Sequence, residues 1–301
     1  EMTPTPTPKI QATPERDEQT KLLELLAVTP GALKDQGVWF GDSARALEME
    51  DLVTVLTLEE LLALGVGLKR YEKALSVIVQ PARTLVKGFA NLQWEQVFGF
   101  GHLAADAGIG IGQSTKTTPT LTYFTGTFDE ATIIANLREL GYDRQTHNGV
   151  DYYAILGDFE YSTEQLPGVL AGNSMNRVAL LDGALLAAAA TQWLTSGLDA
   201  QQGAGETLAD DAAFSGLAYS LGDPLSAALM TKESALLRSG MVPHNLVEFD
   251  RPQGWTPIHD WTAIGLGYRD DGVKRSMRLA LYYPDSTHAA SDGPELVRRM
   301  E

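Results

Sequence analysis

The sequence of 301 residues contains no cysteine. Disulfide bonds and thiolate metal sites are therefore excluded. The chain also lacks an apolar run close to the roughly 20 residues that a bilayer-spanning helix needs. The longest candidate, VALLDGALLAAAA, is interrupted by Asp182 and Gly183 and better fits buried strands. These absences predict a soluble protein, and they are compatible with export without oxidative folding.

Basic residues are scarce. The 23 Lys and Arg residues face 39 Asp and Glu residues, so the formal net charge is −16. Such a charge repels phosphate backbones and anionic lipid headgroups, which argues against a nucleic-acid partner. No Lys or Arg occurs between Val178 and Thr231, although six carboxylates do: Asp182, Asp199, Glu206, Asp210, Asp211 and Asp223. This acidic region is either a solvated face or a place for a bound cation.

Residues 1–18 alternate Thr with Pro and then become charged, which predicts an extended linker. Thr-Pro linkers commonly separate a membrane anchor or signal from an exported bacterial domain. The chain opens with Glu1 rather than Met, so we expect an upstream signal, with a lipid-bearing cysteine as one possibility. On this interpretation the protein meets the membrane only through that anchor. An ordinary disordered terminus is the alternative.

Residues 19–100 have a mainly helical pattern, and we expect them to pack on the core of the protein. Thr57 and Glu60 have capping-box spacing before a helical run. Residues 68–89 place apolar side chains at helical intervals, with Lys and Arg on the other face. Packing of the apolar face on the core is the interpretation we prefer, and a membrane-surface helix is the alternative.

The segment from Gly126 to Leu156 predicts a strand, a helix and two further strands. Thr127 is the expected helix N-cap, and Gly141 is the expected stop. Asn148-Gly149 is a strong signal for a two-residue hairpin turn. Backbone geometry and burial explain every informative residue here, so we expect this segment to be scaffold. Any ligand site would then lie in the acidic region or against the helical N-terminal part.

Two further strand pairs are expected around Asp182-Gly183 and Asp271-Gly272, each followed by a helix. Together these elements predict an α+β fold, with antiparallel sheets, helices packed on one face and ferredoxin-like β-α-β-β elements. The common order of strand, turn, strand and helix suggests a structural repeat. Residues 101–240 would form the α+β sandwich, and residues 241–301 a second unit of hairpin plus helix.

No motif assigns a catalytic, cofactor-binding or metal-binding residue, and no cofactor is expected. His102 and Asp106 have i, i+4 spacing, but a metal site needs a third ligand. Gly108 to Gly112 lacks the Lys-Ser/Thr of a phosphate loop, and the surroundings of Ser174 lack the nucleophile-elbow pattern. The other histidines have no partner at a telling spacing: His147, His244, His259 beside Asp260, and His288. A set of aromatic and acidic residues fits either a sugar groove or cross-strand packing: Tyr152, Tyr153, Phe159, Glu160 and Tyr161.

The Thr-Pro leader, GTFDEATIIANLRELGY, NGVDYYAI, RVALLDG and LADDAAFSGLAYSLGD are similar to segments of uncharacterised exported or lipid-anchored bacterial envelope proteins. The resemblance spans Asn91 to Asp223 and implies an envelope-facing protein, with no catalytic residue carried over. The leading hypothesis is a non-enzymatic extracytoplasmic protein that binds a ligand or an envelope protein. A hydrolase of envelope polymers and a structural assembly component are the alternatives.

Overall fold

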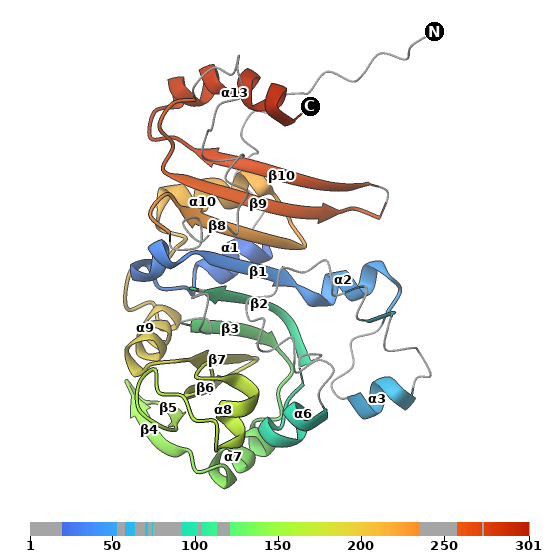
Figure 1. The fold of residues 1–301 in the computed structure, drawn as a ribbon, viewed down its shortest axis with the longest axis vertical. Helices are drawn as coiled ribbons and strands as arrows, with labels where there is room; N and C mark the ends of the chain where they lie inside the picture. The colour runs from blue at the N-terminus through green and yellow to red at the C-terminus, as the bar shows by residue number, and fades with distance from the viewer. Residues whose placement is uncertain are drawn as a thin grey trace.

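The computed structural model describes residues 20–52, 58–63, 70, 71, 74, 92–101, 104–112, 121–234, 258–272 and 274–300. Their strands form one antiparallel ten-stranded sheet in the order β10-β9-β8-β1-β2-β3-β7-β6-β5-β4, which runs along the long axis of the molecule (Figure 1). The strands are β1 (Val38–Asp42), β2 (Ala105–Ile111), β3 (Leu121–Gly126), β4 (Asp143–His147), β5 (Val150–Ala154), β6 (Arg177–Leu181), β7 (Ala184–Ala188), β8 (Ser226–Thr231), β9 (Ala263–Asp270) and β10 (Arg275–Tyr282).

The sheet consists of three runs of strands that are consecutive in the sequence. Strands β1 to β3 form the centre, and β4 to β7 extend it on one side through the pairing of β7 with β3. Strands β8 to β10 extend it on the other side through the pairing of β8 with β1. The sheet is therefore continuous across the boundaries expected near residues 100 and 240, since β1 pairs with β2 and β8 pairs with β9. The α+β class with antiparallel pairing is confirmed.

Alternating side chains along the strands bury both faces of the sheet. On β3, Tyr123 belongs to a core cluster with α1 (Lys21–Leu26), α9 (Thr191–Gln201) and α10 (Ala212–Leu221). Its neighbour Phe124 points to the other face, as the two-residue period of a strand requires. We call the side that carries α9 and α10 the α9 face.

The opposite face is covered by α6 (Leu92–Phe98), α7 (Glu130–Glu139) and α8 (Leu166–Ala171) over the β4 to β7 part of the sheet. Over β8 to β10, Trp261 and Tyr283 close that face instead. The expectation of helices on one face is therefore wrong, because both faces of the sheet are apolar. The other helices are the 3₁₀ helix η1 (Gly31–Gln36), α2 (Ser43–Met49), α3 (Leu58–Ala63) and α13 (Ser286–Met300).

The expected turn chemistry is observed in the Gly126–Leu156 segment, with one correction. Asn148 and Gly149 have φ values of 46° and 82° in a two-residue turn that pairs His147 with Val150, as a primed hairpin turn requires. Gly141 ends the α7 region with φ 88°. The N-cap of α7 is Asp129, whose side chain accepts from the backbone N–H of Thr132, so the assignment of the cap to Thr127 is wrong.

A ferredoxin-like unit is not confirmed. Strand β3 pairs with β2 and β7, whereas β5 pairs with β4 and β6, so β3 and β5 are not neighbours. The structure does contain the order strand, turn, strand and helix twice, in β6-β7-α9 and in β9-β10-α13, but it does not confirm a repeat. Thr57, most of the basic amphipathic stretch over residues 68–89, His102 and His244 lie outside the described residues. In the described part of the chain, no helix combines the length and apolarity that crossing a membrane demands.

Candidate functional site

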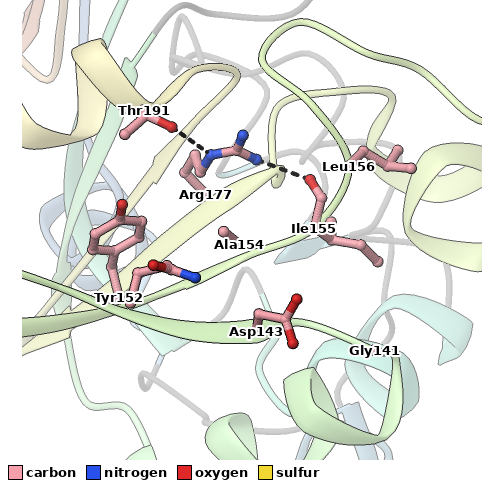
Figure 2. A pocket seen from close by; sticks show the side chains of 9 residues that line it. Gly141, Asp143, Tyr152, Ala154, Ile155, Leu156, Arg177 and Thr191 are labelled. Atoms are coloured by element: carbon pink, nitrogen blue, oxygen red, sulfur yellow. Dashed lines mark hydrogen bonds between the residues drawn. The ribbon is translucent and has the colours of Figure 1, made fainter.

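A polar pocket of about 370 Å³ lies at the β4 end of the sheet, on the α9 face (Figure 2). Strands β4 and β5 supply one wall, and the residues that follow β5 supply another. The start of β6 and the first residue of α9 complete it. The lining residues are Gly141, Asp143, Gln145, Tyr152, Ala154, Ile155, Leu156, Arg177 and Thr191. Seven of these nine come from the segment that the sequence suggested to be scaffold, so a ligand held here would contradict that expectation.

Arg177 forms the rigid inner part of the pocket. Its side chain is only 6% exposed. Nε donates to Thr191 Oγ1 at 2.9 Å, and Nη1 donates to the Ile155 carbonyl oxygen at 2.9 Å, as Figure 2 shows. Nη2 donates to Asp158 Oδ1 at 2.7 Å. With its charge paired and most of its donors engaged, Arg177 acts as a structural tie between β6, α9 and the residues after β5.

Asp158 caps α9 from a distant part of the chain. Ala190, the residue at the N-cap position, has no side-chain oxygen, so Asp158 Oδ1 accepts from the backbone N–H of Thr191 at 2.8 Å in its place. Burial works to raise the pKa of Asp158, but the hydrogen bonds from Thr191 and the charge of Arg177 outweigh it, and the pKa is lowered. The carboxylate therefore stays ionised and fixes the loop after β5 to the helix.

Three polar side chains of the pocket have no hydrogen-bond or ion-pair partner among the described residues: Asp143, Gln145 and Tyr152. Gln145 and Tyr152 lie opposite each other on β4 and β5, and Asp143 lies opposite Ala154, so all point to the same face. An ionised carboxylate only accepts hydrogen bonds, whereas a carboxamide and a phenol both accept and donate. The pocket is therefore suited to a ligand that offers hydroxyl or amine donors.

The loop after β5 is strained and well anchored. Leu156 and Phe159 adopt φ values of 60° and 62°, in the left-handed region that bulky residues rarely enter. Each such residue costs about 1–3 kcal/mol and persists only where its surroundings hold it. The Asn176 side chain donates to the carbonyl oxygens of Gly157 and Glu160, and the Phe159 N–H donates to the Ala189 carbonyl.

The loop after β5 exposes aromatic side chains to solvent. Phe159 is 52% exposed and Tyr161 is 60% exposed, and Leu166 and Val169 of the nearby α8 are also exposed. Tyr152 and Tyr153, by contrast, are buried, as cross-strand packing requires. The aromatic set noted in the sequence is thus divided between the core and the surface.

Four carboxylates of the acidic region form contacts within the protein. Asp199 Oδ1 contacts the His147 ring at 2.7 Å, Asp210 binds the Thr207 backbone N–H, Asp211 caps α10, and Asp223 pairs with Arg45. Among the described residues, no group of three or more His, Cys, Asp or Glu side chains is placed to hold a metal ion. These hydrogen bonds and ion pairs account for four of the six carboxylates in the acidic region.

The structure pairs His259 with Asp292, which the sequence did not suggest. Nδ1 of His259 lies 2.7 Å from Asp292 Oδ1, and the carboxylate is only 5% exposed. The His288 ring stacks on His259 with centroids 4.1 Å apart. In the neutral tautomer that donates Nδ1–H to this carboxylate, Nε2 is the acceptor, as a general base requires. Ser291 Oγ contacts the same Nδ1 at 3.2 Å, so it does not occupy the place of a nucleophile.

The remaining candidates have structural roles. Asp106 lies in strand β2, so it shares no helical face with His102. Gly108 to Ile111 belong to the same interior strand, where a side chain at Gly108 would collide with the Phe124 ring. Ser174 is buried and donates to the Ala171 carbonyl. His259 and Asp260 do not pair, since Asp260 contacts Lys232.

Comparison of the chain with protein-family models, with curated proteins and with solved structures found no match.

Proposed function

We propose that the protein is a non-enzymatic binding protein that holds a small polar ligand, or a polar group of a partner, in the pocket between β4, β5 and α9. The observation that carries this proposal is the strained backbone of Leu156, which has φ 60° and lines the pocket together with three polar side chains that have no partner among the described residues. Strain that is retained at the edge of a pocket indicates a role other than packing.

The arrangement favours binding because the walls are fixed before a ligand arrives. The hydrogen bonds of Arg177 and Asp158 hold the loop to α9, so the ordering cost on binding falls mainly on the ligand. Asp143, Gln145 and Tyr152 supply acceptors and donors on the pocket wall.

Nuclear magnetic resonance titration with a defined panel tests the proposal. The panel contains glycerol, glucose, N-acetylglucosamine, ethanolamine and lysine. Each compound is added up to about 50 mM, so that binding with a Kd in the millimolar range is detected. We expect at least one compound to give saturable shifts at the amides of Asp143, Gln145 and Thr191. Absence of saturable shifts from every compound, or shifts that map to another surface, would overturn the proposal.

Two adjacent residues of β4 provide a matched pair of variants. Gln145 lines the pocket. Thr146 points to the other face of the sheet, where its hydroxyl donates to Asp151, and it does not line the pocket. Gln145→Ala should weaken the binding of the titrated compound at least tenfold, and Thr146→Ala should leave it unchanged. Equal effects of the two variants would show that the shifts do not report the pocket.

We also propose that the protein acts outside the cytoplasm, tethered to the cell envelope through its N-terminal linker. The support is the Thr-Pro composition of residues 1–18 and the absence of cysteine. Cell fractionation of the full-length natural protein tests this, with the envelope fraction as the expected location. Recovery in the cytoplasmic fraction would contradict it.

The hydrolase alternative is favoured by one observation, the exposed His259 ring held by the buried carboxylate of Asp292. In such a reaction Nε2 of His259 would remove a proton from an attacking water molecule. Incubation of the protein with purified peptidoglycan, followed by measurement of released fragments, tests this alternative. Release that persists in His259→Ala would exclude it, as would the absence of release by the unchanged protein.

A further inference from the structure

Two arginine side chains converge at the opposite end of the sheet, beyond the C-terminus of α10. Arg269 of β9 and Arg278 of β10 lie on one face of the sheet, since Arg278 pairs with Gly267, two residues before Arg269. This is the α9 face, because a Cβ on Gly267 would contact Leu221 of α10. Both guanidinium groups approach Gly222, the residue after α10. A methyl group on Gly222 would lie 3.2 Å from Nη1 of Arg278 and 3.3 Å from Nη1 of Arg269, so the two cations share one small volume.

The carboxylates in this region are engaged elsewhere. Asp223, the residue after Gly222, pairs with Arg45. Asp270, the residue after Arg269, pairs with Arg275 at 2.7 Å, and Arg275 also reaches Glu50. Within the described part of the chain, no carboxylate therefore forms an ion pair with Arg269 or Arg278.

The two arginine side chains differ in the hydrogen bonds that they form within the protein. Nη1 of Arg278 donates to the carbonyl oxygens of Leu221 and Ser220 at 3.3 and 3.5 Å, which satisfies the end of α10 in part. Arg269 has no hydrogen-bond acceptor among the described residues, although it is half-buried. Helix capping thus accounts for Arg278, whereas no side-chain hydrogen bond or ion pair within the described part of the chain accounts for Arg269.

The proximity of the two guanidinium groups has an electrostatic cost. Burial lowers the pKa of Arg278, and the neighbouring charge of Arg269 lowers it further. The other arginines of this region, Arg45 and Arg275, each have a carboxylate partner, and the chain contains 39 acidic residues. Two neighbouring arginines without such a partner are therefore exceptional here. Two guanidinium groups that face one volume present several N–H donors, the arrangement that recognises a phosphate group through paired charge-assisted hydrogen bonds.

We propose that Arg269 and Arg278 form a binding site for a phosphate group, either free phosphate or a small phosphate monoester. The site lies on β9 and β10, whereas the proposed ligand pocket lies on β4 and β5, so the two proposals stand independently. Gly222 keeps the site open because any side chain there would meet both guanidinium groups.

Isothermal titration calorimetry with inorganic phosphate and with glycerol 3-phosphate, at constant ionic strength in sodium chloride, tests this proposal. Saturable binding of one or both is expected. Tighter binding of the ester would identify a monoester as the ligand, and tighter binding of inorganic phosphate would identify the free ion. Absence of saturable binding of either compound would overturn the proposal.

Arg269→Gln should raise the Kd of the bound compound at least tenfold, because one of the two cations is lost. Arg144→Gln is the matched control, since Arg144 is exposed and pairs with Asp151 far from the site, and it should leave the Kd unchanged. Equal binding by Arg269→Gln and the unchanged protein would overturn the proposal.

Thermal unfolding in chloride alone separates binding from structure. Removal of an unneutralised cation relieves repulsion, so Arg269→Gln should melt at the same temperature as the unchanged protein or higher when phosphate is absent. Phosphate should then raise the melting temperature of the unchanged protein but not that of the variant. A lower melting temperature of Arg269→Gln in chloride would show that Arg269 is structural and would overturn the proposal.

Discussion

Asp292 binds His259 twice, through the ring Nδ1 at 2.7 Å and through the backbone N–H at 2.6 Å. One buried carboxylate on α13 thereby fixes both the backbone and the side chain of the segment that leads into β9. The contact joins two positions that are 33 residues apart.

The stabilisation from Asp292 should depend on pH. Burial works to raise the pKa of Asp292, but the hydrogen bonds from His259 outweigh it and the pKa is lowered. A lowered folded-state pKa gives stability that is present above the unfolded value of about 4 and is lost as the pH falls below it. Asp292→Asn should therefore reduce the free energy of unfolding by about 1–3 kcal/mol near neutral pH, with a smaller difference below about pH 4.

Urea unfolding at a series of pH values measures this difference. Asp260→Asn is the control, because the Asp260 side chain is 86% exposed and its pair with Lys232 should contribute less than about 1 kcal/mol. A loss from Asp292→Asn that stays constant from neutral pH down through pH 3 would contradict the assignment of the effect to an ionised carboxylate.

Asp158→Ala should destabilise the protein by about 1–3 kcal/mol, because it leaves the buried Arg177 without its carboxylate and the first turn of α9 without a cap. Denaturant unfolding provides the measurement. Asp151→Ala removes the partner of the exposed Arg144 and should cost less than about 1 kcal/mol. Similar losses from the two variants would mean that the Asp158 contact is no stronger than a surface pair.

Asp129→Ala should cost about 1 kcal/mol, since Asp129 caps α7 through the Thr132 N–H. Thr127 is exposed and lies before the helix, so Thr127→Ala should change the free energy of unfolding by less than about 0.5 kcal/mol. Denaturant midpoints at equal slope compare the two variants. A larger loss from Thr127→Ala would reverse the cap assignment.

The features that were predictable from the sequence are those set by neighbouring residues. The Asn148-Gly149 turn and the Gly141 helix stop depend on local backbone geometry, and both are confirmed. The sequence placed the N-cap of α7 two residues too early, at Thr127 instead of Asp129. Thr and Asp side chains can both accept a hydrogen bond from a first-turn backbone N–H, and capping-box spacing favoured Thr127. Local rules therefore located the helix but not its first residue.

Contacts between distant segments were not predictable. Strand β7 joins β3 although β4, β5 and β6 come between them in the sequence, and no local pattern specifies that choice. For the same reason the pairs His259–Asp292 and Arg177–Asp158 were missed. The sequence predicted any ligand site outside Gly126 to Leu156, because Asp143, Gln145 and Tyr152 are ordinary strand residues in the sequence. Only the order of the strands in the sheet brings them into one pocket with Thr191.

Two glycines should resist substitution for different reasons. Gly149 has φ 82°, so Gly149→Ala should destabilise by about 1 kcal/mol and Gly149→Val by roughly 1–2 kcal/mol. Gly293 lies in α13 directly before Pro294, and a Cβ in the helical conformation would meet the proline ring, so Gly293→Ala should also destabilise the protein. Thermal unfolding of the three variants measures these effects. A higher melting temperature of Gly293→Ala than of the unchanged protein would contradict the second expectation.

The central place of β1 in the sheet has a consequence for synthesis on the ribosome. Val38 of β1 pairs with Ile111 on one side and with Leu229 on the other. At about 5–20 residues per second, the β8 partner emerges roughly 10–40 seconds after β1 does. During that interval the second side of β1 has unpaired backbone groups, which attract other strands. A nascent chain stalled before Ser226 should therefore be the form most prone to aggregation and most dependent on chaperones.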